Sequence, residues 1–171
     1  PQPINFETLI DRCLEPSIYS MRILNEFVVV AEAKKQQDYP VHIKFNTGLN
    51  RLGFREEAVS HILSALRKTD AIKTRSLFSH LVASEDLSEK EFTLGQIESF
   101  NNIATAMEEG LGYKPFLHQS NTSGILNYPQ AHFDMVRTGI GLYGFGNSKA
   151  ENEQLKPVAT LKSVISQIHT I

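Results

Sequence analysis

The stretch from His42 to Phe54, HIKFNTGLNRLGF, brings two cationic side chains close to a glycine-containing turn. Alternating apolar residues predict that its first part is a half-buried strand. Lys44 and Arg51 lie at and beyond the end of this strand, with Asn46 between them. In α/β proteins, binding and catalytic residues gather on the loops that follow strands. We therefore infer that Lys44 and Arg51 are candidate functional residues.

Polar and small residues also gather toward the carboxyl ends of other expected strands. In a parallel α/β barrel the carboxyl ends of the strands form the rim where active sites lie. This pattern predicts where a site is, but not which reaction it supports. The further candidates at the rim are His80, Asn121, Thr122, Arg137, Gly139 and Ile140.

Segments with the period of a strand alternate with segments that have the period of a helix. This order predicts βα units with parallel strands and flanking helices, which is an α/β fold. The expected strands are 16–20, 41–47, 74–83, 115–121 and 135–145, and the expected helices are 21–38, 55–70 and 88–111, with a short helical turn at 122–127.

The chain is too short for a complete barrel. A TIM barrel takes about 250 residues and eight strands, whereas 171 residues with five such strands predict a partial TIM (β/α) barrel over 1–145. Residues 146–156 are polar and are interpreted as a linker. The β-branched pattern of 157–171 predicts the first strand of a separate β domain. Since the chain begins at Pro1 and stops inside that strand, we expect it to be part of a longer protein.

Composition narrows the classes of partner and compartment. Seventeen basic and nineteen acidic residues are interspersed and give a net charge of −2, which argues against nucleic acid and a membrane surface as partners. No apolar run reaches the roughly 18–20 residues that span a bilayer. A single cysteine, Cys13, forms no internal disulfide and suits a reducing compartment, so we expect a cytoplasmic protein.

Three histidines in the sequence raise the alternative of a zinc site. His42, His80 and His118 all fall on or near expected strands. Their spacing contains no paired H-x-H or H-E-x-x-H arrangement, so no metal site is predicted. The more common role of a lone histidine is in the core, with its ring nitrogens hydrogen-bonded.

Four segments of the chain form an ordered set of motifs. In chain order they are HIKFNTGLNRLGF, SLFSHLVASED, LHQSNTSGIL and FDMVRTGIGLYG. Together they resemble signature segments of the alanine racemases, which are fold-type III enzymes that use pyridoxal 5′-phosphate (PLP), with an N-terminal α/β barrel followed by a mostly β domain. The resemblance covers nearly the whole chain and implies barrel strands four to eight, conversion between L- and D-alanine for peptidoglycan synthesis, and a homodimer.

The resemblance implies a cofactor-binding role for six residues. Arg137 matches the arginine that hydrogen-bonds the pyridine nitrogen of PLP, and His80 matches a histidine that stacks on the pyridine ring. Thr122, Gly139 and Ile140, together with Asn121, match the phosphate side; Thr122 replaces a serine and keeps its hydroxyl. An alternative for Asn-Thr-Ser is a plain helix N-cap, which is compatible with phosphate binding because both use the same backbone N–H groups.

For Lys44 and Arg51 the resemblance implies positions beside the substrate. The arginine steadies the substrate carboxylate, and the lysine is carbamylated in many members. This sequence departs from the family by Asn46, where an aspartate is usual, and by Asn50, where a glycine or histidine is usual. The loss of the aspartate weakens the expectation of a carbamate, and an ordinary lysine paired with a carboxylate is the alternative.

The two proton-transferring residues of the family have no counterpart in this sequence. Neither the PLP lysine, in a KANAYGHG-like segment, nor the tyrosine of the β domain is present. We therefore expect no catalytic residue within these 171 residues and no activity from them alone. The alternatives are a broader amino-acid racemase, for serine for example, a PLP decarboxylase, whose glycine-rich phosphate segment is absent, and a non-catalytic structural or interaction module.

Overall fold

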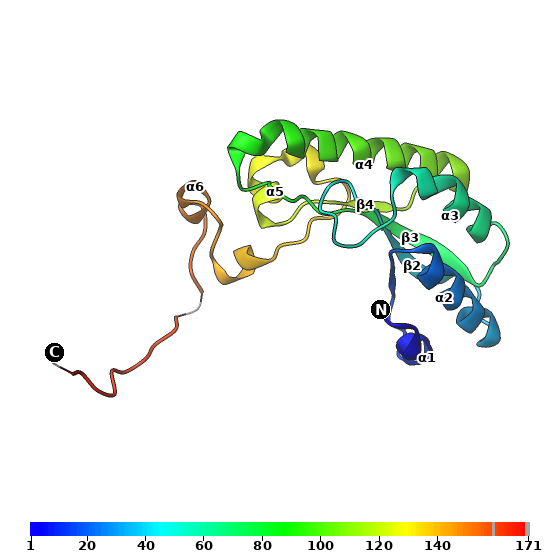
Figure 1. Ribbon diagram of the computed structural model, residues 1–171, viewed down its shortest axis with the longest axis horizontal. Helices are drawn as coiled ribbons and strands as arrows, with labels where there is room; N and C mark the ends of the chain where they lie inside the picture. Colours follow the sequence, from blue (N-terminus) through cyan, green and yellow to red (C-terminus); the bar gives the residue numbers. More distant parts are fainter. Residues whose placement is uncertain (159, 170–171) are drawn as a thin grey trace.

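A computed structural model describes residues 1–158 and 160–169 and is built around one parallel sheet. Each strand pairs in parallel with its neighbour along the chain, in the order β1-β2-β3-β4. Sequential order with parallel pairing is that of a barrel wall, and it confirms the predicted α/β fold (Figure 1). The strands are β1 (Ser17–Ile18), β2 (Tyr39–Lys44), β3 (Ile72–Phe78) and β4 (Phe116–His118).

Helices connect the strands because parallel neighbours require a crossover. The connecting helices are α2 (Met21–Ala33), α3 (Val59–Leu66), which follows a 3-10 turn at Glu56–Ala58, and α4 (Lys90–Leu111), which follows one at Leu87–Glu89. The remaining elements are 3-10 turns at Pro3–Asn5, Pro129–Ala131 and Ile140–Tyr143, and the helices α1 (Phe6–Asp11), α5 (Thr122–Asn127) and α6 (Lys149–Asn152).

One face of the sheet packs into the apolar core, and the other face carries mostly polar side chains. Val41 and Ile43 are fully buried and belong to the main core together with Phe27, Ile62 and Phe100 of the connecting helices. The alternate residues project from the opposite face, which we call the inner face. A register shift after Val41 pairs His42 with Ser76, so that polar residues of adjacent strands meet there. The inner face carries His42 and Lys44 of β2, Ser76 and Phe78 of β3, and His118 of β4.

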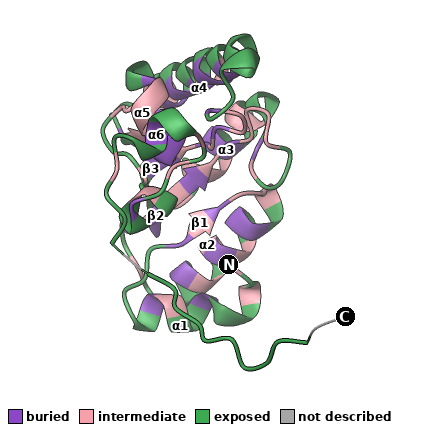
Figure 2. Ribbon diagram, turned by 90° about the vertical axis from the view of Figure 1, so that its left-hand side faces the viewer, coloured by how far each residue is buried: buried purple, intermediate pink, exposed green. Residues whose placement is uncertain are grey.

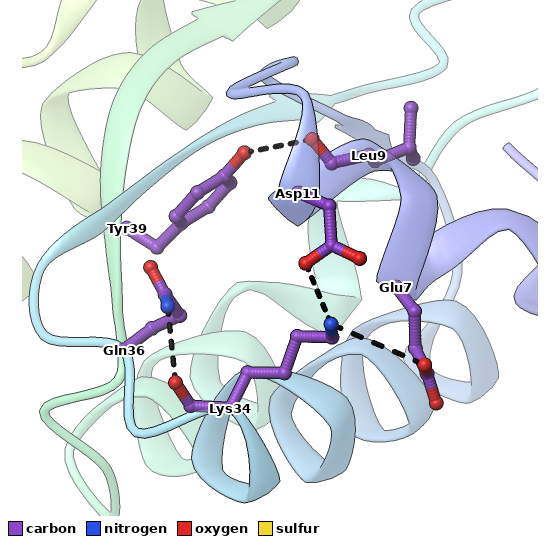
Figure 3. Close-up of polar contacts among 6 residues, drawn as sticks. All are labelled: Glu7, Leu9, Asp11, Lys34, Gln36 and Tyr39. Atoms are coloured by element: carbon purple, nitrogen blue, oxygen red, sulfur yellow. Dashed lines mark hydrogen bonds and ion pairs between the residues drawn. The ribbon is translucent and has the colours of Figure 1, made fainter.

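The N-terminal helix α1 was not predicted, since its six residues are too few for a clear period. Lys34 Nζ, just after α2, lies 2.6 Å from an oxygen of Asp11 and 4.0 Å from one of Glu7 (Figure 3). The Tyr39 hydroxyl contacts the carbonyl oxygen of Leu9 at 3.3 Å. Phe6 adds a fully buried ring at an edge-to-face distance of 5.2 Å from Phe27, so α1 closes the end of the core.

The strand expected over 135–145 is wrong. Residues 134–137 run beside the end of β4, with backbone bonds from Asp134 N to the oxygen of Leu117 and from Arg137 N to the oxygen of Ser120, each 3.1 Å. The chain then turns into the 3-10 helix Ile140–Tyr143. The physical reason lies in two glycine N–H groups, at 139 and 141, which donate to a side-chain hydroxyl instead of a strand ladder.

The strand expected over 157–171 is also absent from residues 160–169, which are irregular and exposed (Figure 2, green). A strand needs a neighbour for its backbone N–H and C=O groups, and the described residues provide none here. Residues 159, 170 and 171 lie outside the described residues. Within the expected linker 146–156, α6 forms, and its Glu151 is 1% exposed, accepting hydrogen bonds from Ser123, Asn127 and Asn147. The division into domains stays a prediction.

Of the described helices, none combines the length and the apolar character required to cross a bilayer.

Candidate functional site

The structure brings three cationic side chains toward one histidine at the carboxyl end of the sheet. Lys44 ends β2, His80 follows β3 by two residues, and Arg137 follows β4 along the chain. Burial, together with the charges of Arg137, Arg51 and Lys44, lowers the pKa of His80 to about 4. Burial, Arg51 and Arg137 lower the pKa of Lys44 as well. His80 is therefore a neutral imidazole near neutral pH.

Arg137 is the most constrained of these residues. Its Nη2 donates to the backbone oxygens of Ser79 at 2.7 Å and Gln119 at 3.0 Å, and lies 3.4 Å from His80 Nδ1. Its Nη1 donates to His118 Nδ1. Among the described residues its Nε has no hydrogen-bond acceptor. Burial lowers the pKa of Arg137 to about 10, so it remains a cation at neutral pH.

The ring of Phe78 lies against several side chains of the site, a role that was not predicted from the sequence. The ring of His118 stacks on it with a centroid distance of 4.8 Å and an angle of 6°. The Arg137 guanidinium carbon lies 5.5 Å, and Lys44 Nζ 5.8 Å, from the centroid of the same ring. The alternation along 74–83 was the available signal, since it places Phe78 on the same face as Ser76.

This positive charge has no carboxylate partner in the part of the chain that the structure describes. Among residues 1–158 and 160–169, no ion pair involves Lys44, Arg51 or Arg137. A partly buried group of cations without an anion is costly. Its chemistry therefore favours an anionic ligand, such as a phosphate or a carboxylate.

A second polar corner lies at the start of α5. Asn121 caps this helix, because its Oδ1 accepts from the backbone N–H of Gly124 at 2.9 Å. Thr122 Oγ1 accepts from the backbone N–H of Gly139 at 3.0 Å and of Gly141 at 3.1 Å. Ile140, between the two glycines, is 46% exposed. The predicted cap is present, and a hydroxyl and two backbone donors meet beside it.

Arg51 is positioned by a turn between β2 and α3. Asn46 Oδ1 accepts from the backbone N–H of Asn50 at 2.9 Å, and Asn46 Nδ2 donates to Asn50 Oδ1 at 2.9 Å. The two positions that depart from the family pattern are thus hydrogen-bonded to each other. Phe54 then pairs with Phe45 and closes the turn.

The three histidines do not converge. Among the described residues, no group of three or more His, Cys, Asp or Glu side chains is arranged to hold a metal ion. His42 and His118 both contact Ser76 instead, at 2.6 and 3.1 Å. His80 lies on the other side of Arg137.

The family model described as "Alanine racemase, N-terminal domain" matches residues 1–146. The chain belongs to the alanine racemase family. The predicted resemblance and the partial barrel are both confirmed by this match.

Relatives within the family extend beyond this chain. An alanine racemase of Methanococcus maripaludis is 30% identical over 167 residues, which are 95% of this chain but 44% of that protein. One of Clostridium tetani is 34% identical over 168 residues, again 95% of this chain and 42% of that protein. The chain therefore spans less than half the length of the alanine racemases it matches.

Solved alanine racemase structures show the same fold. The enzyme from Streptomyces coelicolor has a TM-score of 0.78 at 28% identity and covers 90% of this chain, which corresponds to 42% of that one. A complex of the Clostridium difficile enzyme with cycloserine has a TM-score of 0.82, covering 92% of this chain and 43% of that one. At 24% identity the second likeness concerns the fold alone.

The residues at the rim fit the PLP that the alanine racemase family implies. Arg137 is a partly buried cation that forms no ion pair among the described residues, so it can donate to a ring nitrogen. The Thr122 oxygen accepts from the N–H groups of Gly139 and Gly141, so its hydroxyl keeps its own proton to donate to a phosphate. His80 is neutral, which allows its ring to pack against another ring.

Proposed function

We propose that this chain forms the PLP-binding side of an alanine racemase that interconverts L- and D-alanine and supplies D-alanine for peptidoglycan. The observation that carries the proposal is the group of cations at Lys44, Arg51 and Arg137, which has no carboxylate among the described residues. Such a group suits a phosphate together with an amino-acid carboxylate.

Arg137 governs the chemistry of the cofactor ring in this proposal. When bound, PLP supplies an electron sink that acidifies the α-proton of an amino acid. Both terminal nitrogens of Arg137 are used by backbone and His118 acceptors, while Nε remains to donate to the pyridine nitrogen. A guanidinium has no proton that it readily gives up. Arg137 would therefore hold the ring nitrogen unprotonated, which would weaken the electron sink and favour return of the proton.

The remaining cofactor contacts follow from the rim. Thr122, Gly139 and Ile140 would line the phosphate, with the Thr122 hydroxyl donating to it while Gly139 and Gly141 hold the hydroxyl oxygen, and Asn121 supports them by capping α5. His80 packs its neutral ring against the pyridine ring. The neutral state matters because an imidazolium there would add a fourth positive charge.

Lys44 and Arg51 lie on the substrate side. The lowered pKa of Lys44 increases the fraction of neutral amine, which is the form that adds carbon dioxide and releases a proton to give a carbamate. A carbamate would place an anion among the cations. Asn46 replaces the usual neighbouring aspartate, and its side-chain amide donates a hydrogen bond to Asn50. In the complete enzyme, Arg51→Ala should lose several-fold or more in kcat/KM.

The proton transfers themselves need a lysine and a tyrosine that this sequence does not contain. We therefore propose that residues 1–171 bind the cofactor but do not racemise alanine alone. The complete enzyme is proposed to be a cytoplasmic homodimer that binds a small amino acid and no nucleic acid. Parallel assays with L-alanine and L-serine on that enzyme separate a dedicated from a broader amino-acid racemase.

Binding is the direct test on this chain. We would titrate the 15N-labelled chain with PLP and, separately, with inorganic phosphate, and follow the amide signals of Gly139 and Gly141. We expect saturable shifts with both compounds, which Thr122→Val should weaken several-fold because it removes the hydroxyl. Thr105→Val, on the exposed side of α4, is the matched control and should leave binding unchanged.

Two results would contradict the proposal. The absence of amide shifts at saturating PLP would remove the cofactor assignment. Turnover of L-alanine by residues 1–171 with PLP, near the rate of a complete racemase, would contradict the proposed lack of activity.

A further inference from the structure

A continuous series of hydrogen bonds crosses the inner face of the sheet and ends at Arg137. Glu15 Oε2 lies 2.9 Å from His42 Nε2, and His42 Nδ1 lies 2.6 Å from Ser76 Oγ. Ser76 Oγ lies 3.1 Å from His118 Nε2, and His118 Nδ1 contacts Arg137 Nη1. Glu15 lies two residues before β1, while His42, Ser76 and His118 lie on β2, β3 and β4 and Arg137 lies in the segment after α5.

The proton positions in this series follow from its last member. Arginine carries donors only, so Arg137 Nη1 donates and His118 Nδ1 must accept. A neutral His118 then carries its proton on Nε2 and donates it to Ser76 Oγ. This assignment agrees with the pKa of His118, which burial, Arg137 and His42 lower to about 3.

The same reasoning continues through the serine. Ser76 has one hydroxyl proton and is 1% exposed, so this proton goes to His42 Nδ1, the remaining neighbour in the series. His42 then carries its own proton on Nε2 and donates it to the Glu15 carboxylate. Every donor points away from Arg137, and the series ends on a negative charge.

We propose that Glu15, His42, Ser76 and His118 form one oriented hydrogen-bond chain that fixes the proton positions on both histidines and holds the Arg137 guanidinium in place. Glu15, His42 and Ser76 are positioning residues, because they act on Arg137 through His118. Aligned hydrogen bonds in a low-dielectric environment polarise and strengthen one another. The consequence for the cofactor ring rests on the proposed function, whereas the chain of hydrogen bonds does not.

The arrangement also keeps a proton source away from Arg137. If His118 carried its proton on Nδ1, that proton would face an arginine N–H, and two donors would meet without an acceptor. The Ser76 link makes this state costly, because it binds the proton on Nε2. His118 therefore supports Arg137 without being able to protonate a group beside it.

The test determines which ring nitrogen of His42 and of His118 carries the proton. Long-range 1H–15N spectra of the full chain at neutral pH distinguish a protonated from an unprotonated ring nitrogen. We expect the proton on Nε2 in both His42 and His118. Ser76→Ala should abolish the fixed tautomer of His42 and shift the Arg137 Nε–H signal, although position 76 does not touch Arg137.

Two further variants control for folding and chemistry. Ser17→Ala removes a serine from β1 that pairs with His42 in the sheet but belongs to no described side-chain hydrogen bond, so it should leave both tautomers unchanged. Glu15→Gln keeps an acceptor at the partly exposed end and should retain them, whereas Glu15→Leu should release His42. If Ser76→Ala does not fold, the comparison of Glu15→Gln with Glu15→Leu and the wild-type spectra still test the proposal.

The proposal is overturned if either ring carries its proton on Nδ1 or is doubly protonated in the wild-type chain. It is equally overturned if Ser76→Ala leaves both histidines unaltered. Adding PLP to the same samples separates the two hypotheses. A chain that shows both Nε2 tautomers but binds no PLP refutes the proposed function alone.

Discussion

The perturbed residues of the site share one physical cause. His80, His118, Lys44 and Arg137 all have a pKa below the ordinary value, and burial is the largest cause in each. Nearby cations act in the same direction on the first three. Perturbed pKa values of this kind concentrate at functional sites, although structural networks also produce them.

Acid should destabilise the chain through His118. Its pKa is about 3 in the folded state against about 6.5 unfolded, so the unfolded chain binds the proton first as the pH falls. The contribution of His118 to the free energy of unfolding is fully present above pH 6.5 and decreases as the pH falls toward 3. Between pH 6.5 and 5 the loss from this 5%-exposed residue is about 2 kcal/mol. Urea unfolding of wild type and His118→Asn at pH 7 and pH 5 measures it.

The variant should show a smaller pH dependence than wild type. His61→Asn, which alters an exposed histidine in α3, is the control and should keep the wild-type dependence. Equal pH dependence in wild type and His118→Asn would contradict the assignment.

Arg51 should act on Lys44 by charge alone. Arg51 is among the causes that lower the pKa of Lys44, second to burial. Arg51→Ala should therefore raise that pKa toward 10.5, and 13C signals of the lysine side chain during a pH titration measure it. Arg55→Ala, at an exposed arginine just past the turn, should have little effect. A Lys44 pKa that does not move would mean that the two charges do not interact.

At the scale of elements, the turn between β2 and α3 determines where Arg51 lies. Gly53 closes this turn with φ of +133°, and a Cβ atom there would come within 2.7 Å of the backbone at Phe45 and Asn46. These neighbours are backbone atoms and cannot move aside. The turn therefore depends on glycine for both conformation and space.

Two glycine substitutions should have opposite effects on the free energy of unfolding. Gly53→Ala should lower it by more than about 1 kcal/mol, because the position combines positive φ with a close approach. Gly95→Ala lies inside α4 with no atom within 4 Å of the added Cβ, so it should raise the free energy by about 0.5–1 kcal/mol. Urea unfolding of both variants measures this. Stabilisation by Gly53→Ala would contradict the strained turn.

At the scale of the whole molecule, the sheet has two edges because four strands do not close a barrel. Sheet edges are templates for association. The segment 134–137 partly covers the β4 edge through its two backbone bonds, but apolar side chains within it and after it, over 135–145, stay exposed. Those exposed by 38% or more are Met135, Val136, Ile140, Leu142, Tyr143 and Phe145.

This apolar segment should make the chain self-associate. Sedimentation over a range of concentrations should show reversible oligomers, and Leu142→Lys should weaken them because it places a charge in the contact. Leu87→Lys is the matched control: Leu87 is 64% exposed against 67% for Leu142 but lies before α4. A monomer at all concentrations, or equal effects of the two variants, would contradict association through this segment.

The sequence alone determined the alternation of elements and the family. Parallel strands with flanking helices follow from local periods, and the helical turn at 122–127 and its Asn121 cap follow from residue chemistry. Lys44 and His80 were found because strand ends can be placed from the pattern, whereas the strand expected around Arg137 does not form and its candidacy rested on the family resemblance. The domain boundaries and the roles of the site residues stay predictions.

Tertiary structure decided what periodicity does not contain. The segment 135–145 has the composition of a strand, yet its glycine N–H groups are bound by the Thr122 hydroxyl, a contact between residues about 17 positions apart. Likewise, the sequence placed His42 and His118 on expected strands without showing their partners, and the register shift after Val41 places Ser76 between them. Contacts across strands depend on register, and one shifted residue changes which side chains meet.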